Sequence, residues 1–189
     1  MVVSTRKEAR VTREEWLSKG LELFATSGAS GLRVEKLAKA LDIAKSGFYC
    51  HFEGKDELLD GILEYWARNY TEVISGNEEL LKSPAKDRIL LAMRRVFELN
   101  LTDYDAAIYL WSRSDARVAS KRKQVINIRL QFFRDAFEEL GFHGDDLEMR
   151  TRACAVFQTG ERQILGPEKE ASEKYRKARL QILIGESKQ

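Results

Sequence analysis

The sequence predicts an all-α protein, with a three-helix N-terminal helix-turn-helix domain and a longer helical C-terminal domain, about nine helices in total. Apolar residues recur at helical spacing along most of the chain. Leu, Ala, Glu, Lys and Arg, which favour helices, are abundant. Only 2 prolines and 12 glycines interrupt the 189 residues. No stretch alternates as a β-strand would, and no internal repeat is evident.

The first helix is expected over residues 13–27, where apolar residues recur every three to four positions. Thr12 and Glu15 have the spacing of a capping box, which satisfies amide groups at a helix start. Gly28 is expected to end the helix, because glycine adopts the left-handed conformation at little cost.

Two short helices with a three-residue turn between them are expected next. Residues 34–41 place their apolar side chains on one face, and residues 42–44 form the turn. Residues 45–52 follow, with Phe48 and Phe52 one turn apart and expected to anchor this helix inward. This arrangement predicts a helix-turn-helix motif, whose second helix inserts its N-terminal half into the DNA major groove.

Longer helices are expected through the rest of the chain. Proline at a first helical position, acidic residues at a helix start and glycine at a helix end indicate their boundaries. The expected ranges are 55–75, 83–100, 102–113, 118–140, 145–165 and, after Gly166-Pro167, a last helix to about 184. We therefore expect residues 1–54 to form the helix-turn-helix domain and residues 55–189 the second domain.

Composition and charge restrict the function. The 43% hydrophobic content suits one or two domains with a core, and no apolar run approaches the roughly 18 residues of a membrane span. The polar N-terminus does not resemble a signal peptide, so a cytoplasmic protein is expected. Residues 1–55 carry 10 Lys and Arg against 7 Asp and Glu, and residues 56–189 carry 22 against 23. A slightly basic front on a neutral body fits a nucleic-acid-binding protein.

The stretch GASGLRVEKLAKALDIAKSGFYCHFEGKDELL, residues 28–59, resembles the TetR family of one-component bacterial transcription regulators. The shared features are Ile43, the small residues Ala44 to Gly47, Phe48-Tyr49, His51-Phe52, Lys55 and Leu58-Leu59. The detailed match extends over residues 12–59, whereas the rest of the chain matches only in its all-helical layout.

The resemblance implies a homodimer that binds a palindromic operator, most often as a repressor, through recognition helices of about residues 45–51. It also implies that a small-molecule effector in the C-terminal domain alters DNA affinity. The last two helices are the expected dimer seam. Their candidate faces are Ala153, Ala155, Val156, Phe157 and Gly160 on one helix and Leu180, Leu183 and Ile184 on the other.

The expected DNA contacts are Arg33, Lys45, Ser46, Gly47, Tyr49, His51 and Lys55. Lys45 can reach a phosphate or a guanine edge, and Ser46 and Tyr49 can donate hydrogen bonds to phosphates. Gly47 is expected to let the backbone approach DNA, and Lys55 adds charge at a helix N-terminus. Arg6, Lys7 and Arg10 form a candidate arm along the DNA backbone or minor groove.

Four residues depart from the family pattern. The chain has Asp42 in place of a usual Gly, and aspartate is expected to tolerate the left-handed turn. Ala44 replaces a frequent Ser and Arg33 a common Thr, and neither side chain can cap its helix. Gly47 replaces a common Thr or Ala and lowers helix propensity by about 1 kcal/mol. We therefore expect the recognition helix to order fully only on DNA. A helical interaction protein that has lost sequence-specific DNA binding is the alternative.

The candidate effector-binding residues are Trp66, Phe97, Trp111, Phe133, Phe137 and Phe157. Each one alone is more typical of a core residue, but the group allows an apolar or aromatic effector. Tyr104, Tyr109 and Gln158 are candidate polar contacts. Arg94, Arg95 and Arg129 are candidate partners of an anionic effector, although exposed surface is the more typical role.

No catalytic or metal-binding constellation stands out, so neither an enzyme nor a cofactor is expected. The adjacent Cys50 and His51 diverge on a helix, and no further ligand has usable spacing. The two cysteines, Cys50 and Cys154, do not make a disulfide framework.

Overall fold

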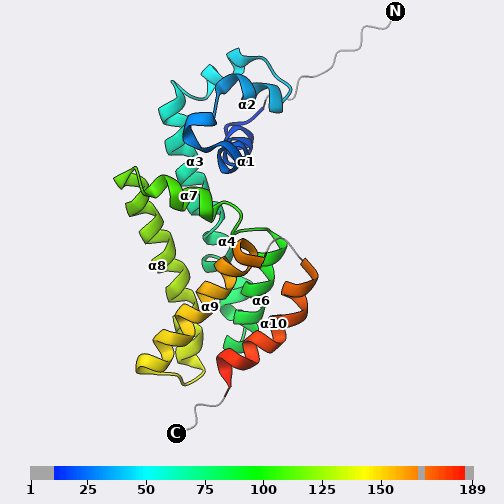
Figure 1. Cartoon of the computed structure of the whole chain (residues 1–189), viewed down its shortest axis with the longest axis vertical. Helices are drawn as coiled ribbons and strands as arrows, with labels where there is room; N and C mark the ends of the chain where they lie inside the picture. Colours follow the sequence, from blue (N-terminus) through cyan, green and yellow to red (C-terminus); the bar gives the residue numbers. More distant parts are fainter. Residues whose placement is uncertain (1–10, 166–168, 186–189) are drawn as a thin grey trace, which may run out of the picture. The chain divides into compact units, whose positions relative to one another are not determined.

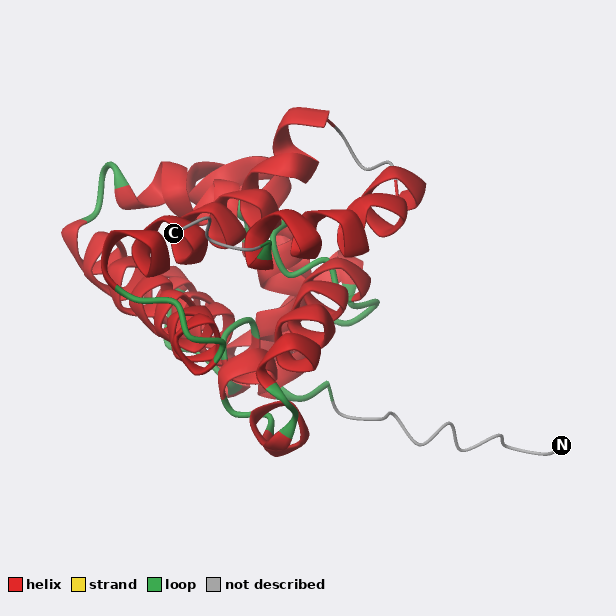
Figure 2. Ribbon diagram, turned by 90° about the horizontal axis from the view of Figure 1, so that it is seen from below, coloured by secondary structure: helices red, strands yellow, loops and turns green. Residues whose placement is uncertain are grey.

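The computed structural model describes residues 11–165 and 169–185. These residues form ten α-helices and one 3-10 helix, and no strand is present among them (Figure 2). The elements are α1 (Arg13–Gly31), α2 (Val34–Ala40), η1 (Lys45–Cys50), α3 (Lys55–Asn69), α4 (Glu72–Ser75), α5 (Glu78–Lys82), α6 (Ala85–Glu98), α7 (Asp105–Ser112), α8 (Ala116–Glu139), α9 (Gly144–Leu165) and α10 (Lys169–Ile184). The predicted all-α class is confirmed.

The expected total of about nine helices is too low, because the helix expected over residues 55–75 is split and one short helix was missed. α3 ends at Asn69, and α4 follows as a separate four-residue helix. α5 begins at Glu78, and its N-cap is Asn77, whose side-chain oxygen accepts a hydrogen bond from the Leu80 amide at 2.9 Å. An asparagine N-cap can start a helix that is too short to show an apolar pattern in the sequence.

The chain divides into two compact units between Tyr65 and Trp66, within α3. The sequence-based boundary after residue 54 stays a prediction. In the structure, the first part of α3 packs with the N-terminal unit because two glycines allow close approach. A Cβ added at Gly20 would meet Ile62 Cδ1 at 2.8 Å, and one added at Gly61 would meet Leu17 Cδ2 at 2.7 Å.

Local signals define the start and end of α1 as expected. The Glu15 amide donates to Thr12 Oγ1 at 3.2 Å, and the Thr12 amide donates to Glu15 Oε2 at 2.7 Å, which completes the capping box. Gly28 has φ 65°, so regular helical backbone ends there although one further turn reaches Gly31. Asp42 has φ 55°, in line with the expectation that aspartate tolerates the left-handed turn.

The core of the N-terminal unit is built around aromatic side chains. Phe48 is fully buried, with its ring edge-on to Trp16 at 5.5 Å and stacked on Phe52 at 5.1 Å. Leu21 and Leu37 are also fully buried. The inward anchoring predicted for Phe48 and Phe52 therefore agrees with the structure.

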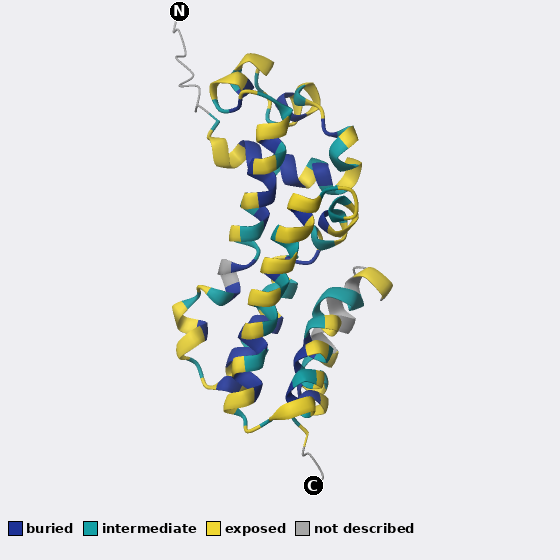
Figure 3. Ribbon diagram, turned by 90° about the vertical axis from the view of Figure 1, so that its left-hand side faces the viewer, coloured by how far each residue is buried: buried dark blue, intermediate teal, exposed yellow. Residues whose placement is uncertain are grey.

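The second unit is a bundle in which α8 packs on α7, α9 and α6, and α10 packs on α6 and α9 (Figure 1). Buried residues face the inside of the bundle and exposed residues the outside (Figure 3). The core includes Ile89, Met93, Phe133, Phe137, Leu180 and Leu183. Leu180 and Leu183, expected in a dimer seam, are therefore core residues of their own bundle.

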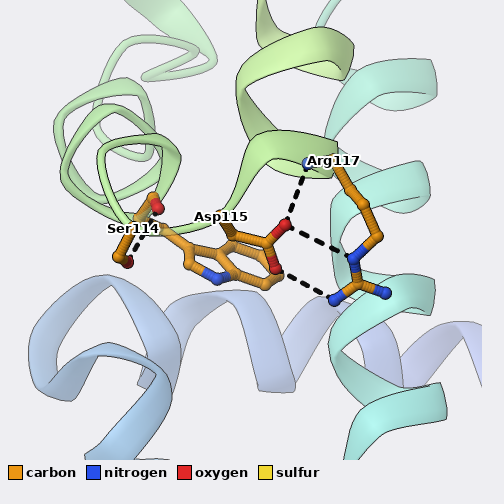
Figure 4. A network of polar contacts seen from close by, with 4 residues as sticks. Ser114, Asp115 and Arg117 are labelled. Atoms are coloured by element: carbon orange, nitrogen blue, oxygen red, sulfur yellow. Dashed lines mark hydrogen bonds and ion pairs between the residues drawn. The ribbon is translucent and has the colours of Figure 1, made fainter.

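Asp115 caps the N-terminus of α8, the longest helix of the described residues (Figure 4). Its carboxylate accepts hydrogen bonds from the Arg117 amide at 2.9 Å and from Arg117 Nη2 at 2.9 Å. These contacts, above all the hydrogen bond from the Arg117 side chain, lower the pKa of Asp115. Ser114 Oγ donates to the Trp111 carbonyl at 3.1 Å in the same connection.

One detail of the second unit differs from the sequence-based expectation, and two further features predicted from sequence lie outside the described residues. Thr102 is the N-cap that the sequence predicts for the helix expected over residues 102–113, but α7 begins after Tyr104 without a side-chain cap. The two features outside the described residues are the candidate arm of Arg6, Lys7 and Arg10 and the break at Gly166-Pro167. Within the described parts of the chain, no helix has both the length and the apolar character needed to cross a bilayer.

The two cysteines should differ sharply in thiol reactivity. Cys50 is exposed, whereas Cys154 is fully buried, and burial raises the pKa of its thiol to about 12. Burial keeps the Cys154 thiol neutral in the folded state, whereas the same thiol in the unfolded chain ionises above its pKa of about 8.5. The free energy of unfolding therefore falls as the pH rises from about 8.5 towards 12.

We expect a disulfide reagent at pH 8 to titrate one thiol in the native protein and two in urea. Equal reaction rates would contradict the burial of Cys154.

Candidate nucleic-acid interface and ligand cavity

The predicted recognition segment is a 3-10 helix, η1, and not the α-helix expected over residues 45–52. Its hydrogen bonds join residues three apart, as in the bond from the Gly47 amide to the Ala44 carbonyl at 3.0 Å. Two residues disfavour an α-helix at this position. Ala44 supplies no side-chain cap, and Gly47 has low helix propensity. Likewise, Arg33 precedes α2 without a side-chain cap, as expected.

Four of the predicted DNA contacts are exposed side chains of the N-terminal unit. Arg33, Lys45, Ser46 and Tyr49 are all exposed, with Tyr49 at 58%. The Tyr49 ring packs edge-on against the buried Phe48 ring at 5.3 Å, so the base of this exposed side chain is held by the core. Three of these residues, Lys45, Ser46 and Tyr49, therefore present one basic and two hydroxyl side chains from η1, which the buried Phe48 ring anchors.

Lys45 is paired in the free protein. Its Nζ lies 2.5 Å from Glu35 Oε1, and both side chains are exposed. The hydrogen bond and the charge of Glu35 raise the pKa of Lys45, and the hydrogen bond from Lys45 lowers the pKa of Glu35. The pair therefore stays charged near neutral pH, and Glu35 partly neutralises the basic side chain at the start of η1.

Lys55 is the first residue of α3 and is partly exposed, as the predicted phosphate contact requires. The same helix end carries carboxylates, however. Glu57 Oε2 accepts a hydrogen bond from the Glu53 amide at 2.7 Å, and Glu57 Oε1 lies 3.6 Å from Arg13 Nη2. The phosphate role of Lys55 stays a prediction, and a phosphate there would compete with Glu57 for the helix end.

His51 fastens the chain that leads into α1. Its Nε2 lies 2.9 Å from the carbonyl oxygen of Val11, and the side chain is partly buried. A carbonyl only accepts hydrogen bonds, so Nε2 carries the proton. In the free protein His51 therefore holds Val11, two residues before α1, and its contact with DNA stays a prediction.

The side of Gly47 on which another residue would carry its Cβ faces the interior. A Cβ built on this residue would lie 3.4 Å from Ile43 Cδ1 and 3.9 Å from Trp16 Cζ2, which are ordinary contact distances. The missing side chain therefore does not open the outer edge of η1, which is the edge predicted to face DNA. The predicted reason for this glycine, close approach of its backbone to DNA, is not supported by this direction.

Replacing Gly47 by alanine should stabilise the protein. The added methyl group fits against Ile43 and Trp16 without strain, and alanine restricts the unfolded chain. We expect the free energy of unfolding to rise by about 0.5–1 kcal/mol, measured by urea denaturation. A loss of stability would show that the inward space at this position is filled.

The second unit contains two neighbouring hollows. The first is an inner cavity of about 50 Å³ between α4, α6, α8 and α9, and Phe133 lines it. The second is an open cleft of about 770 Å³ between the end of α3 and α7, α8 and α9, and Trp66 lines it. The other four aromatic candidates, Phe97, Trp111, Phe137 and Phe157, line neither hollow.

A polar network lies in the wall between the two hollows. Asp105 accepts hydrogen bonds from Trp66 Nε1 at 3.2 Å and from Arg129 Nη1 at 2.7 Å. Arg129 Nη2 also donates to the Tyr70 carbonyl at 3.2 Å. Of the polar residues considered from sequence, Arg129 lines both hollows, Gln158 lines the cavity and Tyr109 lines the cleft.

Sequence reasoning missed most of the polar residues of these walls, including a threonine in the cavity and two arginines in the cleft. Thr71 lines the inner cavity, and Arg122 and Arg152 line the cleft. Arg122 belongs to a basic run that is typical of a solvated helix face. Thr71 lies in the turn between α3 and α4, and Arg152 lies on α9, and neither belongs to a sequence motif. Only the packing of the helices brings Thr71 to the cavity and the two arginines to the cleft.

Comparison with known proteins places the N-terminal part of the chain in a family. Residues 17–62 match the model described as "Bacterial regulatory proteins, tetR family". The HTH-type transcriptional regulator AcrR of Shigella flexneri is 33% identical over 73 residues, which are 39% of this chain and 34% of that protein. The Tetracycline repressor protein class D of Escherichia coli is 30% identical over 125 residues, 66% of this chain and 54% of that protein.

The matched segments therefore span only 34% and 54% of the length of these two relatives. A solved structure, the transcriptional regulator FadR of Bacillus subtilis in complex with stearoyl-CoA, superimposes with a TM-score of 0.67 at 17% identity. It covers 90% of this chain and 96% of that chain, and it shows a shared fold.

Proposed function

Since this chain belongs to the TetR family of bacterial regulatory proteins, we propose that it is a ligand-responsive transcriptional repressor. In this proposal a homodimer binds a palindromic operator, and η1 of each protomer enters the major groove. A small-molecule effector in the second unit changes the affinity for DNA. The single observation that carries the proposal is the anchored turn of Lys45, Ser46 and Tyr49.

Support for DNA contact comes from the opposite environments of neighbouring residues in η1. Phe48 is fully buried while Tyr49, the next residue, is 58% exposed. A recognition element needs this combination, because the buried side fixes the geometry that the exposed side presents to phosphates and bases.

Support for a homodimer comes from exposed apolar side chains on the last two helices. On α9, Met149, Val156 and Ile164 are 64%, 64% and 80% exposed and lie on one face. On α10, Tyr175 and Ile182 are seven residues apart and 51% and 72% exposed. A contiguous exposed apolar face is typical of a protein–protein interface. These residues replace Leu180 and Leu183 in the proposed seam.

Support for an effector comes from the hollows of the second unit and from the fold shared with FadR, which was solved with stearoyl-CoA. The cleft volume of about 770 Å³ lies within the roughly 300–1,000 Å³ typical of small-molecule sites. Its walls combine aromatic, aliphatic and charged side chains.

The direct test is fluorescence titration of the full chain against DNA from upstream of its own gene. We expect specific binding to at least one palindromic site, with an affinity that falls steeply as salt rises. Equal affinity for that site and for random DNA would refute the proposal and favour the helical interaction protein.

Replacing Glu35 by glutamine should strengthen DNA binding. The change removes the carboxylate that holds Lys45 and takes one negative charge away from the approaching phosphates. We expect an affinity increase of about two- to tenfold at low salt and a steeper dependence on salt. Replacing Glu78, which pairs with Lys82 in the second unit, by glutamine is the matched control and should have no effect.

A further inference from the structure

Two buried polar atoms at the inner cavity have no hydrogen-bond partner among the described residues. They are Thr71 Oγ1 and Gln158 Nε2, and both residues line the cavity. Thr71 is only 3% exposed. The remaining wall is largely apolar and includes Ile74, Val96, Leu101, Phe132 and Phe133. Folded proteins seldom leave buried polar groups unsatisfied, so these two atoms require an explanation.

The chemistry of the two atoms indicates which kind of ligand atom would pair with them. Gln158 Nε2 is a donor, and the Thr71 hydroxyl can donate as well as accept. A ligand oxygen, from a carbonyl or a hydroxyl, would accept from both inside an otherwise apolar site. A purely hydrocarbon ligand would leave both groups buried without a partner, which is unfavourable.

The cleft next to this cavity has a different character. Three arginines line it, Arg122, Arg129 and Arg152, against one lining carboxylate, Asp105. Asp105 is already bound to Arg129 at 2.7 Å. Arg122 lies over the Tyr109 ring at 4.9 Å, and Arg152 Nε is 3.9 Å from Glu148, a carboxylate bound more closely by Arg134 at 2.7 Å. The cleft therefore favours an anionic group.

The two hollows are adjacent. Arg129, Ala155 and Thr159 line both of them. Ala155 and Thr159 are small, so the Arg129 side chain is the bulkiest part of the shared wall. A single site that spans both hollows therefore requires Arg129 to rotate away from Asp105.

We propose that the cavity and the cleft form one site for an amphipathic organic anion. Its charged group binds at Arg122 and Arg152, its apolar body passes Arg129, and an oxygen at the far end accepts from Gln158 and Thr71. This inference rests on the proposed function, since it assigns a chemical class to the effector of that function.

A series of three ten-carbon probes tests the assignment by isothermal titration of the full chain. 9-Oxodecanoate has both the carboxylate and the distal ketone, decanoate lacks the ketone, and methyl 9-oxodecanoate lacks the charge. We expect 9-oxodecanoate to bind about tenfold more tightly than either of the other two, as one hydrogen bond or one charge contact allows. Equal affinities, or no binding by any probe at about 1 mM, would overturn the proposal.

Variants assign each end of the probe to its residues. Gln158→Leu should abolish the advantage of 9-oxodecanoate over decanoate without changing decanoate binding. Arg122→Gln combined with Arg152→Gln should abolish its advantage over the methyl ester. Lys123→Gln, an exposed neighbour outside the cleft lining, is the control and should leave all three affinities unchanged. Unchanged preferences in the first two variants would refute the assignment.

A DNA titration with and without 9-oxodecanoate separates this inference from the function on which it rests. Probe selectivity without any change in DNA affinity would support the site and refute its role as the effector site. An operator-binding protein that ignores all three probes would retain the proposed function and refute the anion site.

Discussion

Replacing Phe48 by alanine is expected to lower the free energy of unfolding by about 3–5 kcal/mol and to abolish DNA binding. Phe48 is fully buried, and its ring contacts those of Trp16 and Phe52 at 5.5 and 5.1 Å. The lost ring would leave a cavity beneath η1. Because small proteins are stable by only about 5–15 kcal/mol, this one substitution removes a large part of the margin.

The neighbouring aromatic residue provides the matched control. Tyr49 is 58% exposed, so Tyr49→Ala should change stability by less than about 1 kcal/mol. It should nevertheless weaken DNA binding at every sequence, because Tyr49 is proposed to contact a phosphate. Urea denaturation followed by circular dichroism, together with DNA titration, separates the two effects. Similar stability losses in both variants would contradict the buried and exposed assignment.

The sequence predicted features that depend on neighbours along the chain. The capping box of Thr12 and Glu15 and the left-handed Gly28 follow from interactions within four residues. The inward orientation of Phe48 and Phe52 follows from apolar spacing in the same way. The resemblance to the TetR family, which rested on a short segment with fixed spacing, is confirmed by the family model over residues 17–62.

Features that depend on contacts between distant segments were missed. Glu35 and Lys45 are ten residues apart and pair only because the turn at Asp42 brings η1 back against α2. The inward direction of Gly47 depends on where Trp16 packs. A glycine's backbone freedom can be read from sequence, but the side that its missing Cβ would occupy cannot.

The ligand hollows illustrate the same limit. Aromatic residues were natural candidates for an effector site, yet Phe137 is fully buried in the bundle core. Helical periodicity identifies the side of a helix that is buried, but it does not distinguish a packed core from the wall of a cavity. Thr71 and Gln158 become notable only once the structure shows them buried without partners in the described residues.

Replacing Ile164 and Ile182 by aspartate is expected to convert the protein to a monomer and to weaken operator binding by about a hundredfold or more. Both side chains are among the most exposed apolar residues, at 80% and 72%, on the two helices proposed to form the dimer seam. Two aspartates per protomer would place four like charges in a buried symmetric interface, which is strongly unfavourable. The substitutions should scarcely alter the stability of the bundle itself, because both sites face solvent in the single chain.

The effect on DNA follows from the loss of linkage between two half-sites. In a dimer, binding of one recognition element raises the effective concentration of the other, which is worth about 10²–10⁴ in affinity. The monomer should therefore retain weak half-site binding, with a shallower salt dependence because fewer phosphates are contacted. Light scattering gives the mass, 21.7 kDa for one chain. Ile128→Asp on α8, 47% exposed, is the control and should stay dimeric. A double variant that keeps the mass and operator affinity of the unmodified protein would place the seam on another face.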